Sequence, residues 1–272
     1  MTPSLQYDQV VPMALSPGLA LVNRDPGLDY RALPRISNSD LTRIKEEQLG
    51  YQLSATRWAT ERTRTFGKAF HQHLLEPETV GTVLEQLLPD LTNGRLTGSE
   101  LNKLDGLMDA VRHDAFCRRY LRLAERTQSG HSARQEAAEA QRERIVLFTD
   151  PTTQLACKSR LDLVYTSPKR QNALIFDFKT TSARTQAQFL QSCYDYEYDR
   201  QAAFYLDSLR YADQHEWATT KRFRFVFIGV MKQKPHRLFA VDATSLPGFI
   251  EYGRKKYRFW LKKWQETNGL TD

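Results

Sequence analysis

The feature that most constrains this chain is a pair of segments with alternating side chains, Arg160–Val164 and Ile175–Thr181, separated by a short polar stretch. Side chains alternate faces along a strand, so Asp177 and Lys179 project from the same side of the second segment. The polar stretch predicts a turn, and the two strands then form a hairpin that brings Asp162 beside Asp177. We therefore predict two carboxylates and a lysine close together at one sheet.

This set of residues predicts chemistry on phosphate esters. Two carboxylates a few ångströms apart repel each other unless they share a cation, and oxygen ligands favour Mg²⁺ or Mn²⁺. Hydrolysis of a phosphodiester needs such a cation to activate water, and a lysine to orient the water or to stabilise developing charge. The alternative is a surface hairpin with an ordinary Asp-x-Lys ion pair, because this spacing is common.

Two further segments add candidate residues. Downstream, Gln201 and Tyr205 stand four residues apart, on one face of a predicted helix. Upstream, Phe66–Pro77 predicts a helix in which His71 lies on an apolar face and His73 points elsewhere. On this pattern alone His71 is either a core residue or a metal ligand. A zinc site that combines both histidines with scattered cysteines also remains open, although no Cys-x-x-Cys spacing supports it.

In these segments the chain resembles the nuclease domain of the RecE-type exonucleases (exonuclease VIII), within the PD-(D/E)XK superfamily. Four blocks carry the resemblance in family order, and they are Arg31–Leu41, Phe66–Glu78, Asp150–Asp162 with Asp177–Thr181, and Tyr194–Tyr205. Such an ordered set is far more specific than any one motif. The fold that it implies is α/β, with a central mixed β-sheet flanked by helices.

The resemblance implies a role for each residue of the site. It makes His71, Asp162 and Asp177 metal ligands, adds the backbone carbonyl of Phe178 as a further ligand, and makes Lys179 the catalytic lysine. The implied cofactor is Mg²⁺, for which Mn²⁺ can substitute.

The resemblance also implies supporting residues. Gln201 and Tyr205 match a helix that supports the site and the DNA backbone. Glu143 falls where the family often has an acidic residue, but it lies in a charged run, and a solvated role stays open. Leu161 replaces the proline that usually precedes the first aspartate. Since that proline is not a ligand, the change bears on strand geometry more than on chemistry.

Composition fits a globular protein with a polyanionic substrate. A chain of 272 residues with 40% hydrophobic content can bury one substantial core. We expect a single nuclease domain over residues 31–272 and an N-terminal arm over residues 1–30. The 39 Lys and Arg residues outnumber the 32 Asp and Glu residues, and the formal charge of +7 suits nucleic acid.

The cysteines and the hydropathy bear on the compartment. Cys117, Cys157 and Cys193 are widely spaced and odd in number, which argues against disulfides and indicates a reducing cytoplasm. They are too few for a four-cysteine iron–sulfur cluster. We find neither an apolar stretch of about 18 residues nor a signal-peptide pattern, so we expect a cytoplasmic protein that does not span a membrane.

Periodicity predicts the remaining elements. The first of the elements given below, a helix, begins with a capping-box pattern. The elements are a helix over Ser37–Leu53, a helical region over Leu101–Ala124, a solvated connector over Glu125–Arg144, strands within residues 143–181, a helix over residues 186–211, and strands at Arg222–Val230 and Phe239–Val241. A C-terminal amphipathic helix around Ile250–Trp264 has a basic face that either follows DNA phosphates or is merely solvated.

By resemblance, the activity is digestion of linear double-stranded DNA from 5′ ends, leaving 3′ single strands for recombination. The implied partners are DNA with free ends, further copies of the chain in a ring-shaped homo-oligomer, and a single-strand annealing protein. One alternative is a single-strand or structure-specific endonuclease with the same chemistry. The other is a non-catalytic DNA-binding scaffold, which is disfavoured because the predicted ligands and Lys179 are all present.

Overall fold

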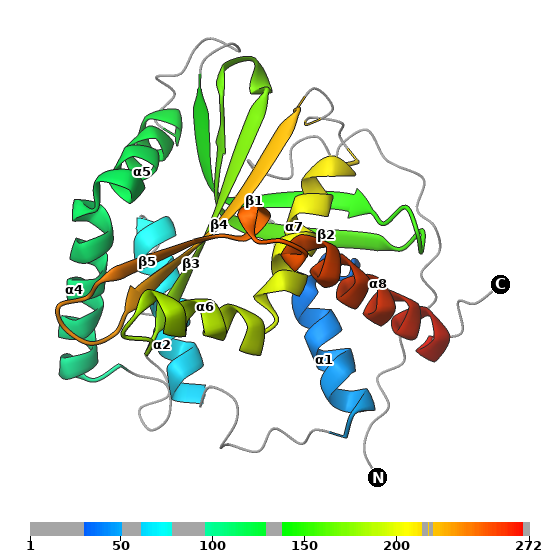
Figure 1. Cartoon of the computed structure of the whole chain (residues 1–272), viewed down its shortest axis with the longest axis horizontal. Helices are drawn as coiled ribbons and strands as arrows, with labels where there is room; N and C mark the ends of the chain where they lie inside the picture. Colours follow the sequence, from blue (N-terminus) through cyan, green and yellow to red (C-terminus); the bar gives the residue numbers. More distant parts are fainter. Residues whose placement is uncertain are drawn as a thin grey trace.

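A five-stranded mixed sheet in the order β1-β2-β3-β4-β5 forms the centre of the structure (Figure 1). Neighbouring strands are antiparallel, except that β3 and β4 are parallel. The strands are β1 (Glu139–Thr149), β2 (Ala156–Thr166), β3 (Asn172–Thr181), β4 (Arg222–Met231) and β5 (Leu238–Asp242). This arrangement confirms the predicted α/β fold and the predicted hairpin.

The structure is a computed structural model of the chain, and it describes residues 30–50, 61–77, 96–128, 138–213, 217 and 220–268. The predicted N-terminal arm lies outside the described residues apart from Tyr30, as do the last residues of the predicted Ser37–Leu53 helix.

Helices cover both faces of the sheet. One face carries α1 (Asn38–Gln48), α6 (Gln186–Asp195), α7 (Tyr198–Arg210) and α8 (Phe249–Thr267). The other carries α2 (Glu61–Leu75), α4 (Gly98–His113) and α5 (Ala115–Gln128). Short 3-10 helices, η3 (Pro168–Arg170) and η4 (Ala243–Ser245), lie between the longer elements. None of the helices in the described part of the chain is both long and apolar enough to cross a bilayer.

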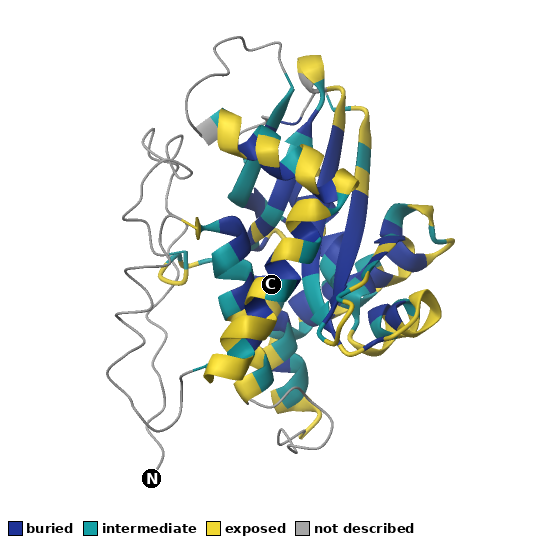
Figure 2. Cartoon of the chain, turned by 90° about the vertical axis from the view of Figure 1, so that its left-hand side faces the viewer, coloured by how far each residue is buried: buried dark blue, intermediate teal, exposed yellow. Residues whose placement is uncertain are grey.

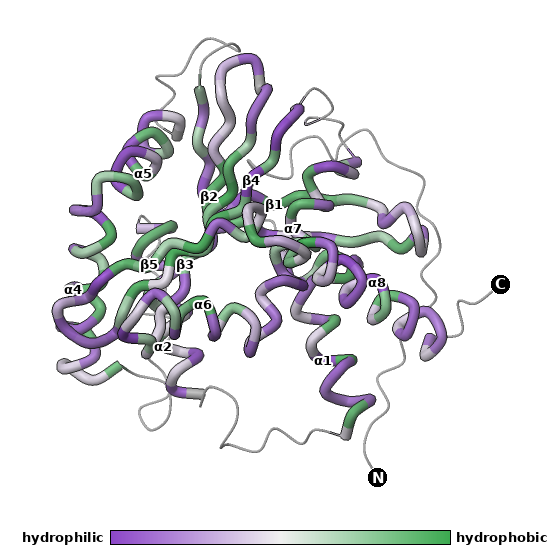
Figure 3. Tube along the Cα trace, in the orientation of Figure 1, coloured by the Kyte–Doolittle hydropathy of each residue, from purple (hydrophilic) through white to green (hydrophobic). Residues whose placement is uncertain are grey.

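Each face of the sheet has its own apolar cluster, because the side chains of β3 alternate. Ile175 packs in the cluster that includes α7, whereas Phe176 and Phe178 pack in the cluster that includes α2 and α4. Figure 2 shows the sheet as a buried layer between helices whose outer faces are exposed, and Figure 3 shows the central parts of the strands as hydrophobic and several strand ends as hydrophilic. The alternation leaves Asp177 and Lys179 on the α7 side, as the sequence predicts.

Two predicted helices are each divided in the structure. The helical region over Leu101–Ala124 breaks at Asp114, which leaves helical geometry and whose carboxylate accepts the Cys117 N–H at 2.8 Å. The helix over residues 186–211 breaks at Glu197, whose φ is 53° and whose carboxylate pairs with Lys45 at 2.9 Å. Hydrophobic periodicity continues across both breaks, so it did not reveal them.

The predicted solvated connector over Glu125–Arg144 is wrong at both of its ends, and its middle, residues 129–137, lies outside the described residues. Helix α5 continues to Gln128, and β1 begins at Glu139 and runs for 11 residues. The error has a physical cause, because the first half of β1 carries polar side chains that form ion pairs instead of packing apolar groups. Confirmed elements include the capping box of Ser37 and Asp40.

Helices α7 and α8 pack unusually closely. A Cβ added at Gly253 of α8 would clash with the backbone carbonyl of Asp199 in α7. The buried carboxylate of Asp207 in α7 accepts hydrogen bonds from Arg254 at 2.6 and 2.8 Å and from the Tyr257 hydroxyl at 2.7 Å. The two helices are thereby joined by backbone contact and by a buried charged hydrogen bond.

This contact predicts a large effect for one methyl group. We expect Gly253→Ala to lower the free energy of unfolding by about 3 kcal/mol or more, because the clash is with backbone that cannot move aside. Gly98→Ala is the matched control, since Gly98 is also helical and its added Cβ meets nothing within 4 Å. Denaturant unfolding of both variants measures the difference, and equal stabilities would contradict the close packing of α7 and α8.

Candidate active site

Three neighbouring strands carry an acidic residue at the same level of the sheet. The pairing of β1 with β2 skips only Glu143 and Asp162, which therefore lie opposite each other. The pairing of β2 with β3 ends at Leu163 and Phe176, one residue before Asp162 and Asp177. The ladder is interrupted without a change of register, and three carboxylates lie in a row across the gap.

The side chains of β1 change face at this level. Val146 and Phe148 pack in the cluster that includes α7, whereas Ala140, also even-numbered, packs in the opposite cluster. Glu143 has a φ of 48°, a conformation that residues other than glycine rarely adopt. In Figure 1 the hairpin of β1 and β2 turns beyond this level toward α7 and α8. Uncommon backbone geometry of this kind concentrates at functional sites.

Asp162 occupies the gap between β2 and β3. Its Oδ2 accepts the Phe178 N–H at 2.8 Å, so the carboxylate replaces a strand partner that the open ladder does not supply. The N–H and C=O of one strand residue point to the same side, and the Phe178 carbonyl therefore faces the same gap. A role of this carbonyl as a metal ligand stays a prediction.

A metal-sized cluster surrounds Asp162. One ligand atom each from His71, Glu143 and Asp162 lies within 4.8 Å of the other two. His71 of α2 places Nδ1 3.3 Å from Asp162 Oδ2, and Arg160 of β2 places Nε 2.8 Å from Glu143 Oε2. Glu143 is therefore at the centre of the site, and the solvated role that its charged sequence context left open does not describe it.

Asp177 lies beside this cluster and has different partners. Gln201 Nε2 of α7 donates to Asp177 Oδ1 at 2.7 Å. Lys179 Nζ lies 2.6 Å from Asp177 Oδ2 as an ion pair, although Oδ2 is buried and forms no hydrogen bond of good geometry with the described residues. Of the predicted site residues, the structure brings together His71, Glu143, Asp162, Asp177, Lys179 and Gln201.

Tyr205 lies one helical turn after Gln201 and packs partly buried against Phe225. Burial, together with the nearby Asp177 carboxylate, raises the pKa of Tyr205 to about 12. The phenol is therefore neutral at physiological pH. It is close enough to Asp177 for the two groups to influence each other electrostatically, and its supporting role stays a prediction.

Two residues of the site were not singled out from the sequence. The Tyr198 ring lies 5.1 Å from Lys179 Nζ, within the range of a cation–π interaction, and it stacks on Phe227. Arg160 neutralises part of the charge of Glu143, as described above. In the sequence, only their proximity to predicted site residues indicated a role for them. Arg160 stands two residues before Asp162, and Tyr198 lies in the block that contains Gln201.

Burial and mutual repulsion control the charges of the site. Burial and the Asp162 carboxylate raise the pKa of Glu143 to about 8. Burial raises the pKa of Asp177 to about 6; Lys179 opposes this rise and Asp162 adds to it. Burial would also raise the pKa of Asp162, but His71, Lys179 and the Phe178 N–H together outweigh it and hold this pKa below the ordinary value. Three carboxylates at this separation thus do not all ionise readily without a cation.

Lys179 remains a cation. Burial alone would lower the pKa of Lys179, but Asp177, Tyr198 and Asp162 together outweigh it and raise the pKa above the ordinary value. A lysine that stays protonated cannot accept a proton from water. It can donate hydrogen bonds to a water or stabilise negative charge on a phosphate.

The residues present fit a divalent cation. His71, Glu143 and Asp162 supply a compact donor set, and the hydrogen-bond-free Oδ2 of Asp177 lies on the adjacent strand. Carboxylate oxygens favour Mg²⁺ or Mn²⁺, whereas an imidazole adds affinity for transition metals. The zinc alternative has no such support, because all three cysteines are buried and free, and none joins a metal-capable group among the described residues.

Comparison with known proteins agrees with this geometry. Residues 46–268 match the model of a family described as "PDDEXK-like domain of unknown function (DUF3799)". None of the curated proteins matches the sequence.

Solved structures show a similar fold. A Eubacterium rectale protein described as a "putative exonuclease" aligns over 88% of this chain and 83% of its own, with 13% identity and a TM-score of 0.53. At this identity the similarity shows the fold alone. The structure of SSO0001 aligns over 85% of this chain and 84% of its own with 11% identity, but its TM-score of 0.32 is too low to indicate a shared fold.

The raised pKa values predict how cation binding depends on pH. A cation must displace the proton of Glu143, so we expect affinity for Mg²⁺ or Mn²⁺ to rise about tenfold per pH unit up to about pH 8, with one proton displaced. Titration calorimetry across this range measures the dependence. Glu143→Gln is the control, and it should bind more weakly at high pH with a flatter profile. An affinity for the cation that does not change with pH would contradict the assignment of Glu143.

Proposed function

The chain belongs to the PDDEXK-like family DUF3799, and from this premise we propose that it is a Mg²⁺-dependent exonuclease that degrades linear double-stranded DNA. The observation that carries the proposal is the convergence of Glu143, Asp162 and Asp177 on one gap in the sheet, with Lys179 paired to Asp177. Clustered carboxylates with a permanently protonated lysine suit phosphodiester hydrolysis better than any other common reaction.

Each side chain has a distinct part in this proposal. His71, Glu143, Asp162 and Asp177, with the Phe178 carbonyl, would hold the cation. A cation bound there supplies polarisation of a phosphoryl oxygen and activation of water.

The supporting side chains keep these groups in place. Gln201 fixes one oxygen of Asp177 through its 2.7 Å hydrogen bond, and this leaves the other oxygen toward Lys179. The Tyr198 ring packs against the Lys179 ammonium and limits where it can move. Lys179 then lies where it can orient water or stabilise charge on the phosphate.

The finer assignment rests on the resemblance to the RecE-type exonucleases. It supports digestion from 5′ ends that leaves 3′ single strands for recombination. It also supports a ring-shaped homo-oligomer around DNA, a single-strand annealing protein as partner, and one nuclease domain over residues 31–272 with a preceding arm. A high formal charge of +7 is compatible with DNA as the substrate.

The central chemical prediction concerns Lys179. We expect Lys179→Ala to reduce Mg²⁺-dependent cleavage of linear duplex DNA by about a hundredfold or more, because a cation is lost where charge develops on the phosphate. Lys255→Ala is the matched control, since Lys255 is an exposed lysine on α8. Circular dichroism checks that both variants fold. Undiminished cleavage by the Lys179 variant would exclude the proposed role.

A second prediction separates the exonuclease from its alternatives. We expect the protein with Mg²⁺ to degrade linear duplex DNA and release a 5′ label early, while covalently closed circles stay intact. An end-dependent enzyme has no point of entry on a circle. Gel analysis of 5′-labelled, 3′-labelled and circular DNA measures this directly. Nicked circles would instead assign an endonuclease, and tight binding without cleavage would assign a scaffold.

A further inference from the structure

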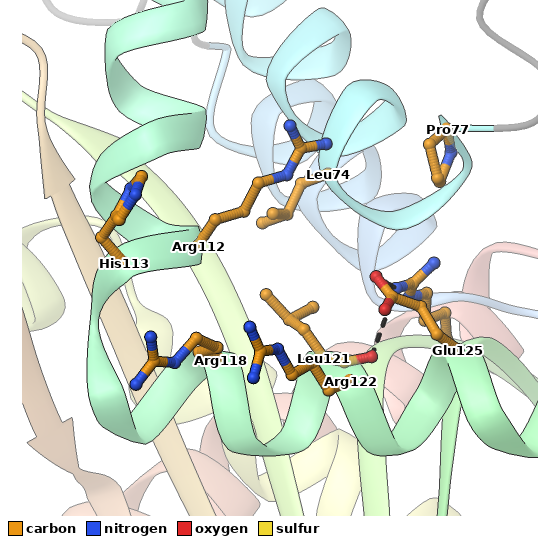
Figure 4. A pocket seen from close by; sticks show the side chains of 9 residues that line it. Leu74, Pro77, Arg112, His113, Arg118, Leu121, Arg122 and Glu125 are labelled. Carbon is orange, nitrogen blue, oxygen red and sulfur yellow. Dashed lines mark hydrogen bonds and ion pairs between the residues drawn. The ribbon is translucent and has the colours of Figure 1, made fainter.

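A basic pocket lies close to the active site, on the other side of β1. It has a volume of about 300 Å³ and is formed between α2, α4, α5 and β1 (Figure 4). Its lining consists of Leu74, Pro77, Arg112, His113, Arg118, Leu121, Arg122, Glu125 and Arg142. Four of these residues are arginines and one is an acid, so the pocket has a marked positive charge.

Two of the arginines in the pocket form no intramolecular ion pair with the described residues. Arg118 and Arg122 stand four residues apart on α5, which places them on one face of the helix. Both are exposed, and their side chains form no hydrogen bond or ion pair with any described residue. Two like charges this close on one helix face destabilise the helix slightly. Their presence is therefore better explained if the two arginines bind an anionic ligand.

Arg142 forms the buried wall of the pocket. Only 4% of its side chain is exposed, and its Nη2 donates to the Leu121 carbonyl at 3.3 Å and to Glu125 at 3.1 Å. Its Nε is buried and forms no hydrogen bond within the described part of the chain. A buried guanidinium with an unused donor is costly, and negative charge in the adjoining pocket would offset part of that cost.

Two elements carry residues of both the pocket and the active site. On β1, Arg142 lines the pocket and the next residue, Glu143, lies in the metal cluster. On α2, His71 lies in the cluster and Leu74 lines the pocket, about one helical turn of 5.4 Å away. Because β1 is an edge strand of the sheet, a nucleic-acid strand bound at the site can reach the pocket around this edge.

We propose that this pocket binds a backbone phosphodiester of the DNA strand being cleaved, and this inference rests on the proposed function. The guanidinium fork matches phosphate oxygens in a bidentate way, and phosphate contacts fix the position of a nucleic acid without reading its sequence. The apolar walls, Leu74 and Leu121, suit contact with sugar. The adjoining hollow, lined by His73, Pro77, Asp105, Met108, Asp109 and Arg112, has two acids beside its arginine and is less favourable for a phosphate than the pocket.

The basic face of α8 is the other surface that could bind DNA phosphates. Most of its positive charges already lie in ion pairs with acidic residues of the protein. Arg254 and Arg258 interact with Asp207 and Asp150, and Lys256 pairs with Asp199 at 2.8 Å. The exposed lysines Lys255 and Lys262 remain. They provide a matched pair, because their removal takes away the same charge as removal of Arg118 and Arg122.

The test compares two double variants of the full chain. Binding of a fluorescent duplex is measured in chelator, so that cleavage does not interfere, for wild type, Arg118→Ala/Arg122→Ala and Lys255→Ala/Lys262→Ala. We expect the arginine variant to bind about tenfold more weakly and its salt-dependence slope to fall in magnitude by about 1 to 2, since one or two phosphates are lost. We expect the lysine variant to match wild type. With Mg²⁺, the arginine variant should raise KM and leave kcat within about twofold.

Each other outcome is decisive. Equal DNA affinity of all three proteins would overturn the proposal that the pocket binds a phosphodiester. An equal loss of affinity in both variants would also overturn it, because that loss would reflect net charge alone. A loss that appears only on 5′-phosphorylated DNA would assign the pocket to a terminal phosphate and overturn the backbone assignment. If wild type binds DNA through these arginines but cleaves nothing, the pocket stands and the proposed nuclease activity fails. All variants are checked by thermal unfolding, and exposed substitutions of this kind rarely change stability by more than about 0.5 kcal/mol.

Discussion

The opening of the sheet at Asp162 is the constraint on which the rest of the site depends. A continuous ladder would pair the backbones of β1, β2 and β3 through this level and leave no room for a ligand between the strands. Instead, Asp162 accepts the Phe178 N–H with its own side chain, so the strands separate without leaving that buried donor unpaired. The same carboxylate then faces Glu143 on one side and Asp177 on the other. One residue thus keeps the backbone satisfied and concentrates the negative charge.

Much of the site could be predicted from local sequence, because strand alternation and helical spacing act over a few residues. Asp177 with Lys179, and the hairpin that carries Asp162, follow from period two and a polar turn. Glu143 was harder to assign, since its role depends on pairing across β1 and β2 and its neighbours are charged. The end of the predicted connector, which is the start of β1, and the helix breaks at Asp114 and Glu197 were missed for the same reason. Long-range contacts override local periodicity there.

The basic residues of the protein differ in whether they are free to bind an anionic ligand. Formal charge counts every lysine and arginine equally, yet several cations of α8 lie in ion pairs that join it to α7 and to the end of β1. Arg118 and Arg122 on α5 form no such ion pairs with the described residues. Where helices pack closely, basic residues stabilise the fold. Where a pocket separates them, the same residue types remain able to meet a ligand. A basic helix face in a sequence therefore indicates nucleic-acid binding only after its acidic neighbours are known.

Helix α7 contributes to the catalytic centre and to the core at once. Gln201 near its start holds Asp177, and Asp207 two turns later is buried against Arg254 and Tyr257 of α8. Loss of α8 would leave the Asp207 carboxylate exposed beside unpaired apolar surface and free α7 to shift. A gene copy with an early stop codon before Phe249 would still encode every residue proposed to act at the site, yet its product would lack the support that aligns them. Intact motifs alone are therefore insufficient grounds for counting a shortened homologue as an active nuclease.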